Sequence, residues 1–186
     1  MIGNVKKIKA IIVPGNGGDK SESKWFPYIA QELEKLGVPT INRKFPDSIL
    51  ARKKYWFSFL NELGVDKDTI LIGYSSGAVA AMRYAEQNKI LGSVLVSVYD
   101  TDLGILSEKA SGYFDTEWNW DAIRSNQQWI IQFASTDDPH ITIEHPRIIH
   151  EHLGTEYYEF NDHGHFGSEW KEFPELINAL RKRLEI

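Results

Sequence analysis

The sequence predicts an α/β protein with one doubly wound, parallel sheet of about six strands and helices on both faces. Short apolar runs alternate along the chain with segments whose apolar residues recur at helical spacing. Ile90–Val98 is almost continuously apolar, as expected of a parallel strand that is buried on both faces. Strands separated by helices require crossovers, and crossovers pair the strands in parallel. No repeat, low-complexity tract or linker divides the 186 residues, so residues 1–186 are predicted to form a single domain.

The predicted strands are short apolar or β-branched runs that end at turn residues. They are Lys9–Val13, Val38–Arg43, Thr69–Gly73, Ile90–Val98, Trp129–Phe133 and Tyr157–Phe160.

The predicted helices have apolar residues three or four positions apart, and Gly37 and Gly64 supply stops. They are Trp25–Leu36, a helix capped by Asp47 that runs through Tyr55 to Leu63, Ser76–Glu86, Trp118–Asn126, Ile143–His152 and Ser168–Leu184, the last interrupted near Pro174. Asp100–Glu117 lacks a clear period and is predicted to be an inserted loop.

The composition excludes several classes of protein. With 42% hydrophobic and 25% charged residues, the chain is neither disordered, collagen-like nor a coiled coil. A net charge of −5 gives no field that would recruit nucleic acid or an anionic membrane. No apolar run approaches the roughly 18 residues of a membrane span. We therefore expect a cytoplasmic protein, which could also reach the nucleus by diffusion, and a monomer.

The chain has no cysteine. Disulfides, thiolate metal sites, iron–sulfur clusters and cysteine nucleophiles are therefore all excluded. Any nucleophile must be Ser, Thr, Lys or a carboxylate.

The main motif is Gly73-Tyr74-Ser75-Ser76-Gly77, between a predicted buried strand and a predicted helix. A Gly-x-Ser-x-Gly sequence in this context is typical of a nucleophile elbow, a sharp turn that lifts the central serine above the sheet. The helix N-terminus then places free amides and a positive dipole end beside it. We predict Ser75 as the nucleophile and the backbone N–H of Ser76 as one oxyanion donor, with the Ser76 side chain capping the helix. The alternative is an ordinary glycine-rich turn with a capping serine.

An acid and a base follow in the order that such enzymes use. Asp137 and Asp138 lie in the segment that follows the fifth predicted strand, and His163 and His165 lie in the segment that follows the sixth. Asp138 is preferred because Pro139 fixes the chain direction after it, which leaves Asp137 to cap the loop or meet solvent. His165 is preferred because Gly164 gives it a flexible approach, and His163 is predicted to be a surface residue or a donor to the site.

The loop after the first strand, Pro14-Gly15-Asn16-Gly17-Gly18, is predicted to supply the second oxyanion amide, from Asn16 or from Gly15. A phosphate cradle is the alternative. However, a dinucleotide fingerprint would need glycine where Lys20 stands, and the spacing also fails a Walker A loop. A metal site built from the Asp-His-x-His segment has no supporting second cluster. We therefore expect no cofactor and no metal.

The segment of about residues 100–120 is rich in aromatic side chains. Tyr113, Phe114, Trp118 and Trp120 could form an aromatic wall for a small acyl or aromatic group. The alternative is that they pack the insert onto the core.

These residues together resemble a known family. The segments Val13–Gly18, Gly73–Gly77 with Ala81–Glu86, Ala110–Phe114, Ser135–Pro139 and Gly164–Phe166 are similar to those of retinoblastoma-binding protein nine and its relatives, which are small serine hydrolases. The resemblance covers nearly the whole chain. It implies a reduced α/β-hydrolase fold, a three-layer α/β/α sandwich with strand order 2-1-3-4-5-6, and a triad of Ser75, Asp138 and His165. The partner motif of that family, Leu-x-Cys-x-Glu, is replaced here by Leu63-Gly64-Val65-Asp66-Lys67, which argues against retinoblastoma-type partner binding by this route.

The resulting functional prediction is a serine hydrolase that acts through an acyl-enzyme on small carboxylic esters or related acyl substrates. A short chain leaves little room for a large lid, which favours small substrates. Amidase, aminopeptidase and thioesterase activities would use the same three residues, because leaving-group preference depends on pocket shape. A non-catalytic binding module of the same fold is the alternative from another class.

Overall fold

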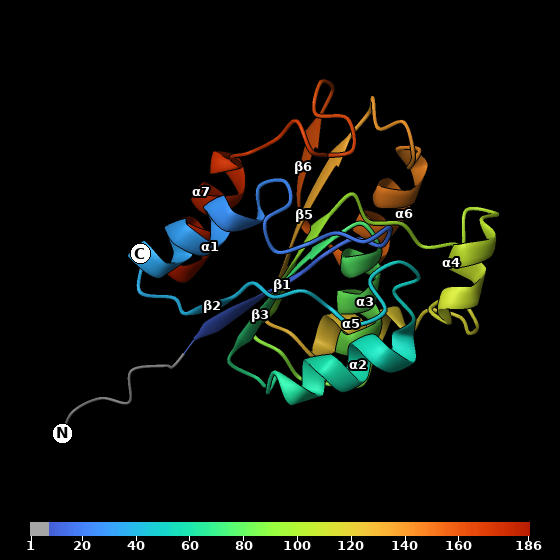
Figure 1. Ribbon diagram of the computed structural model, residues 1–186, viewed down its shortest axis with the longest axis horizontal. Coiled ribbons are helices and arrows are strands. Elements are labelled where there is room, and N and C mark those ends of the chain that lie inside the picture. Colours follow the sequence, from blue (N-terminus) through green and yellow to red (C-terminus); the bar gives the residue numbers. More distant parts are fainter. Residues whose placement is uncertain (1–7) are drawn as a thin grey trace.

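A six-stranded parallel sheet forms the centre of the computed structural model, which describes residues 8–186 (Figure 1). Its strands are β1 (Lys9–Val13), β2 (Thr40–Ile41), β3 (Thr69–Tyr74), β4 (Gly92–Val96), β5 (Trp129–Ser135) and β6 (Glu156–Phe160). Their order is β2-β1-β3-β4-β5-β6, and every neighbouring pair is parallel. The predicted fold class and strand order are confirmed.

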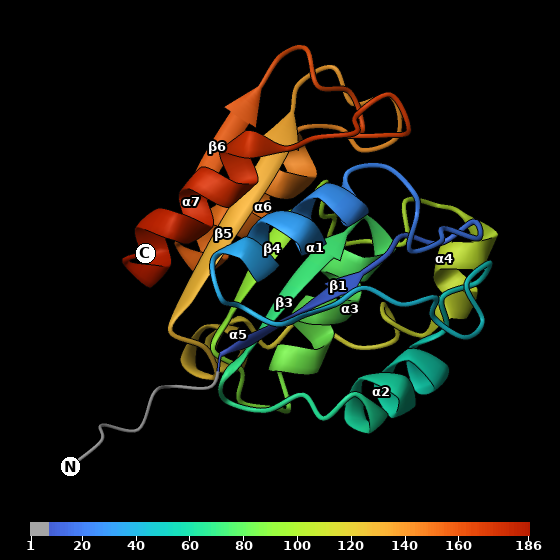
Figure 2. The ribbon, with the colours of Figure 1, turned by 60° about the vertical axis from the view of Figure 1, so that its left-hand side comes forward.

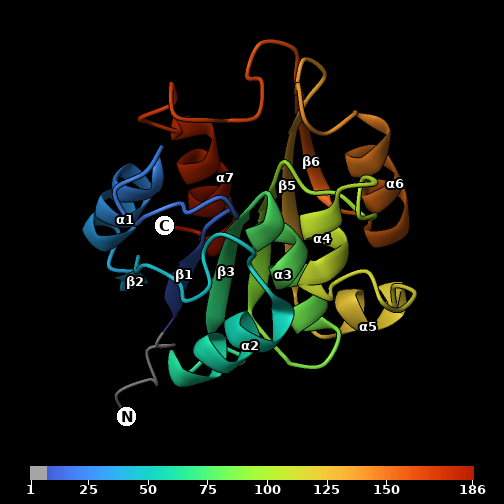
Figure 3. The ribbon, with the colours of Figure 1, turned by 45° about the vertical axis from the view of Figure 1, so that its right-hand side comes forward.

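Helices cover both faces of this sheet. They are α1 (Phe26–Lys35), α2 (Lys53–Glu62), α3 (Ser76–Ala85), α4 (Leu106–Ser111), α5 (Trp120–Ser125), α6 (Glu144–Leu153) and α7 (Pro174–Leu184). Figures 2 and 3 show α1 and α7 together on one face and α3, with α2 and α5 beside it, on the other. Within the residues described, no helix combines the length and apolar character needed to cross a bilayer.

Two hydrophobic cores result from the alternation of side chains along the strands. In β1, Ile11 and Val13 belong to the core under α3, whereas Ala10 and Ile12 belong to the core under α1 and α7. The central strands are therefore buried on both faces, which explains their continuous apolar sequence.

Several element boundaries differ from the predictions. The second strand pairs over Thr40–Ile41 alone. Asp47 does not cap α2; its carboxylate instead binds the side chain and backbone N–H of Arg52, the residue that precedes the helix. The closing helix begins at Pro174 rather than being interrupted there, because proline suits the first helical turn, where no N–H is needed.

The predicted inserted loop after β4 contains a helical turn and a half. Here α4 lies at the edge of the molecule, beside the loop that follows β1 (Figures 1 and 2). A helix of six residues is too short to show a period in the sequence.

Candidate active site

The turn between β3 and α3 holds Ser75 in a backbone conformation that most residues avoid, with φ 53° and ψ −120°. The two flanking glycines make this turn possible. A Cβ on Gly77 would lie 2.1 Å from the carbonyl oxygen of Val13, and one on Gly73 would lie 2.5 Å from backbone atoms of α3. The β1 loop can therefore press directly against the start of α3, and Ser75 stands at the carboxyl edge of the sheet.

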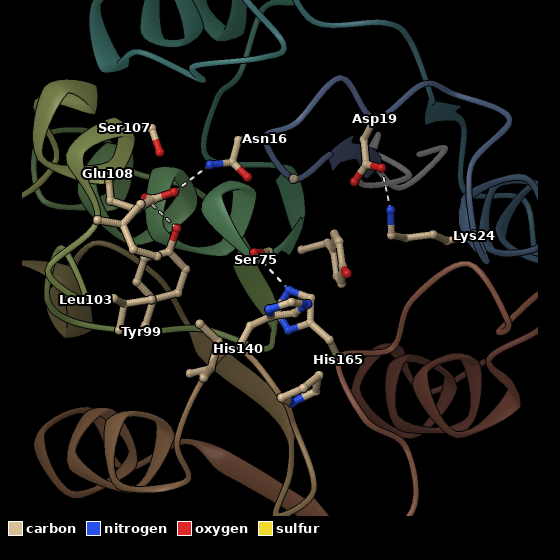
Figure 4. Close-up of a pocket in the computed structure, with 15 residues that line it drawn as sticks. Asn16, Asp19, Lys24, Ser75, Tyr99, Leu103, Ser107, Glu108, His140 and His165 are labelled. Atoms are coloured by element: carbon tan, nitrogen blue, oxygen red, sulfur yellow. Dashed lines mark hydrogen bonds and ion pairs between the residues drawn. The ribbon is translucent and has the colours of Figure 1, made fainter.

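A row of hydrogen bonds joins three of the predicted residues (Figure 4). Ser75 Oγ lies 3.2 Å from His165 Nε2, and His165 Nδ1 lies 2.7 Å from Asp138 Oδ2. The carboxylate accepts at Nδ1, so that nitrogen carries the proton and Nε2 is left free to accept from the serine hydroxyl. Asp138 is itself held by the backbone N–H groups of His140 and Ile141, which both donate to Oδ1.

The charge on Asp138 is stabilised where it is needed. Burial alone would raise the pKa of this carboxyl, but hydrogen bonds from His165 and from the two backbone amides outweigh burial and bring the pKa below its usual value. Asp138 is therefore ionised at neutral pH and can orient and stabilise an imidazolium.

Asp137 points elsewhere. Its carboxylate accepts from the hydroxyl of Ser135 and from the backbone N–H of Gly164, so it fastens the β5 loop to the β6 loop. Asp137 therefore fixes the backbone just before His165 and takes no part in the row of hydrogen bonds from Ser75 to Asp138.

The surface prediction for His163 is wrong. This imidazole is buried between the rings of Phe160 and Trp170, with centroids 4.0 and 4.1 Å away. Its Nδ1 contacts the carboxylate of Asp162, which is largely exposed. In the described part of the chain, no group of three or more His, Asp or Glu side chains is placed to hold a metal ion.

The predicted oxyanion donors flank the serine. Asn16 and Gly15 line the same cavity as Ser75, and Ser76 follows it as the first residue of α3. Within residues 8–186, neither the N–H of Asn16 nor that of Ser76 donates to another protein group. The Ser76 side chain does not cap α3; its hydroxyl lies 2.9 Å from the hydroxyl of Tyr99.

The cavity above Ser75 has a volume of about 550 Å³. One flank comes from the segment after β4 and the loop after β5, and it combines the apolar side chains of Leu103, Ile105 and Ile141 with the polar side chains of Tyr99 and Glu108. The other carries an ion pair between Asp19 and Lys24, whose ammonium lies 4.9 Å from the centre of the Tyr74 ring (Figure 4). Burial raises the pKa of Tyr74, so its hydroxyl stays neutral.

The four predicted pocket aromatics are not among the residues that line this cavity. Tyr113 is fully buried, and Phe114, Trp118 and Trp120 pack against the core around α3. Trp118 also covers the guanidinium of Arg83, 3.6 Å from its ring centre. The alternative, that these rings fasten the insert to the core, is the one that the structure supports.

Sequence reasoning missed several polar residues of the cavity, among them Tyr99, Asp19, Glu108 and His140. Tyr99 could have been found, because it follows the carboxyl end of the fourth strand. Asp19 and His140 lie in the loops after β1 and β5 and carried the same signal, whereas Glu108 lies on α4, and only the tertiary structure brings it to the cavity.

Comparison with known proteins agrees with this geometry. A family model described as serine hydrolase matches residues 10–182. The serine hydrolase RBBP9 of Rattus norvegicus is 44% identical over 179 residues, which is 95% of each chain, and this confirms the resemblance drawn from the motifs.

Among solved structures, the ydeN gene product of B. subtilis has a TM-score of 0.87 at 20% identity, over 96% of this chain and all of that one. The esterase EaEST of Exiguobacterium antarcticum has a TM-score of 0.68 at 13% identity, over 94% and 92% of the two chains. At these identities the two structures show a shared fold only. The family model and the rat relative show that this chain belongs to the serine hydrolase family.

Proposed function

We propose that this protein hydrolyses small carboxylic esters or related acyl substrates through an acyl-enzyme on Ser75. The observation that carries the proposal is the row from Ser75 and His165, which both line the cavity, to a buried, ionised Asp138 behind them. A pure binding module would not need this row, and its geometry and polarity suit proton transfer from the serine.

The reaction would run in two steps. Ser75 Oγ attacks the acyl carbon while His165 Nε2 takes its proton, and the imidazolium then returns that proton to the departing alcohol. Water then gives a proton to the same nitrogen and attacks the acyl carbon; the bond between that carbon and Ser75 Oγ breaks, the imidazolium returns the proton to Oγ, and the acid leaves. The N–H groups of Asn16 and Ser76 are proposed to bind the oxyanion in both steps.

The cavity favours a small acyl substrate as the binding partner. Its volume lies within the range of pockets for small molecules, and we place the acyl group against its apolar lining residues Leu103, Ile105 and Ile141. On the opposite flank, the charges of Asp19 and Lys24 cancel each other, so this flank carries no net charge toward a substrate. We propose neither a nucleic-acid nor a membrane partner, and we propose that the protein acts as a monomer in the cytoplasm.

A fluorophosphonate probe tests the nucleophile directly. The wild-type protein should be labelled on the peptide that contains Ser75, and Ser75→Ala should not be labelled. Ser76→Ala tests the adjacent serine: it keeps the backbone amide, so Ser75 should still be labelled, although more slowly because the Ser76 hydroxyl no longer contacts Tyr99. Equal labelling of wild type and Ser75→Ala, or a folded wild type that remains unlabelled between pH 6 and 9, would overturn the proposal. Parallel panels of esters, thioesters and aminoacyl amides then decide the leaving group.

A pair of adjacent residues tests where the acyl group lies. Ile105 lines the cavity, whereas Leu106 is exposed and does not. Ile105→Ala removes three carbons from a half-buried side chain. At roughly 0.8 kcal/mol per fully buried methylene, halved for the partial burial, the loss is about 1.2 kcal/mol, so KM for a butyrate ester should rise about eight-fold. Leu106→Ala should leave KM unchanged. Steady-state kinetics on acetate and butyrate esters measure this. An equal effect of the two substitutions would contradict the proposal that the acyl group lies against Ile105.

A further inference from the structure

A buried carboxylate beside the cavity has no part in the row of Ser75, His165 and Asp138. Glu108 lies on α4 and is 5% exposed, and among the described residues it forms no ion pair. Its two oxygens are instead bound by neutral groups. The side-chain amide of Asn16 donates to Oε1 over 2.5 Å, and the hydroxyl of Tyr99 donates to Oε2 over 2.7 Å.

The direction of these hydrogen bonds can be followed to the start of α3. The single proton of the Tyr99 hydroxyl is given to Glu108, so the Tyr99 oxygen must accept the proton of Ser76 Oγ, 2.9 Å away. The result is a continuous network of three hydrogen bonds that joins Asn16, Glu108, Tyr99 and Ser76. Figure 4 shows Asn16, Glu108 and Tyr99 together on one side of Ser75, opposite Asp19 and Lys24.

Both ends of this network are residues whose backbone amides are proposed to bind the oxyanion. The loop that carries Asn16 needs outside support, because Gly17 and Gly18 both have positive φ and give it no stiffness of its own. Their N–H groups are tied to the carbonyls of Ile49 and Ser48. On the cavity side, the side chain of Asn16 is tied to Glu108.

Burying a carboxylate without a cation is costly, because burial disfavours its charged form. Burial raises the pKa of Glu108, and the hydrogen bonds from Tyr99 and Asn16 offset only part of the effect; Asp102 adds repulsion. An apolar residue of the same size would fill the space at lower cost. The carboxyl group differs from such a residue in one respect: it accepts hydrogen bonds from Asn16 and Tyr99 and so holds both side chains in place.

We propose that Glu108 is a positioning residue for the oxyanion hole, which it holds through the side chain of Asn16 and, by way of Tyr99, through Ser76. This inference rests on the proposed hydrolase function. It assigns the insert a role that its aromatic residues do not have: α4 brings one carboxylate to the loop after β1 and fixes the distance between the two amides. Preorganised donors stabilise a developing oxyanion only when they are already in place, so a small displacement reduces kcat.

Two substitutions of nearly equal size separate this role from packing. Glu108→Gln keeps the network, because its oxygen accepts from Tyr99 and its amide can donate to a flipped Asn16 side chain. Its kcat should stay within about three-fold of wild type. Glu108→Met fills the same space without an acceptor, and its kcat should fall about 10- to 100-fold with KM changed less than three-fold, since a lost oxyanion donor costs about 10²–10³ in kcat.

Asn16→Ala tests the same link from the other end. Asn16 is only partly buried, and the substitution keeps its backbone amide, so the protein should fold even if Glu108→Met does not. Its kcat should fall about ten-fold. The double variant Asn16→Ala with Glu108→Met should be no slower than the slower single variant, because both remove one shared link.

The controls keep the two proposals apart. If the wild type fails to react with the fluorophosphonate, the hydrolase proposal fails. If the wild type reacts and hydrolyses esters, but folded Glu108→Met or Asn16→Ala turns over at the wild-type rate, only the positioning role is overturned. A Glu108→Gln variant as slow as Glu108→Met, or effects of Asn16→Ala and Glu108→Met that multiply in the double variant, also overturn it. Thermal unfolding of each variant identifies those that are folded.

Discussion

We expect Asp138→Asn to lower kcat for ester hydrolysis by about 10⁴-fold while leaving the fold intact. The backbone N–H groups of His140 and Ile141 both bind Oδ1 of Asp138, so an asparagine would keep its oxygen there. Its amide nitrogen would then face Nδ1 of His165, which would have to accept a hydrogen bond. The imidazole proton would move to Nε2, and a protonated Nε2 cannot accept the proton of Ser75. Steady-state kinetics on one activated ester measure this loss.

Asp137→Asn is the matched control for this prediction. Its oxygen can still accept from Ser135 and Gly164, so kcat should stay within about three-fold of wild type. A larger loss in Asp137→Asn than in Asp138→Asn would reverse the assignment of the acid.

The lowered pKa of Asp138 gives a second readout for this pair. A carboxyl whose folded pKa is depressed stabilises the protein above its unfolded pKa of about 3.9. This contribution is lost as the pH falls through the folded value. The difference in the free energy of unfolding between wild type and Asp138→Asn should therefore shrink below about pH 4.

Gly77→Ala should cost roughly 3 kcal/mol or more in the free energy of unfolding. Its Cβ would lie 2.1 Å from the carbonyl oxygen of Val13 and 2.4 Å from that of Pro14, and backbone atoms in a paired strand cannot move aside as a side chain can. Helix propensity acts in the opposite direction, since alanine is favoured over glycine inside a helix by about 1 kcal/mol. A net loss of this size therefore reports the contact between the β1 loop and α3. Urea unfolding measures it.

Gly17→Ala is the control for this second prediction. A Cβ at Gly17 would meet no atom within 4 Å, but its φ of +76° disfavours any side chain. The expected cost is about 1–2 kcal/mol, from the left-handed backbone alone. Equal losses for the two variants would show that the close approach at Gly77 has little weight.

The sequence by itself determined the parallel sheet, its strand order through the family resemblance, and the candidates Ser75, Asp138 and His165. It could do so because period and burial are local signals, and because each of these residues lies in the turn or loop that follows a strand, where parallel topology brings loops to one edge. The elbow was also readable, since its glycines mark a turn that only glycine permits.

Only the tertiary structure decided the rest. Whether the insert's aromatic residues faced the cavity or the core depended on how the chain after β4 folds back, which no local pattern records. His163 was predicted at the surface, yet Trp170 and Phe160 bury it. The network from Glu108 to Asn16 joins residues 92 positions apart, and the hydroxyl of Ser76 turns from its expected cap to Tyr99. The contacts of these side chains depend on which segments lie side by side in the folded protein. Segments far apart in the sequence are brought together only by the complete fold, so no local pattern predicts their contacts.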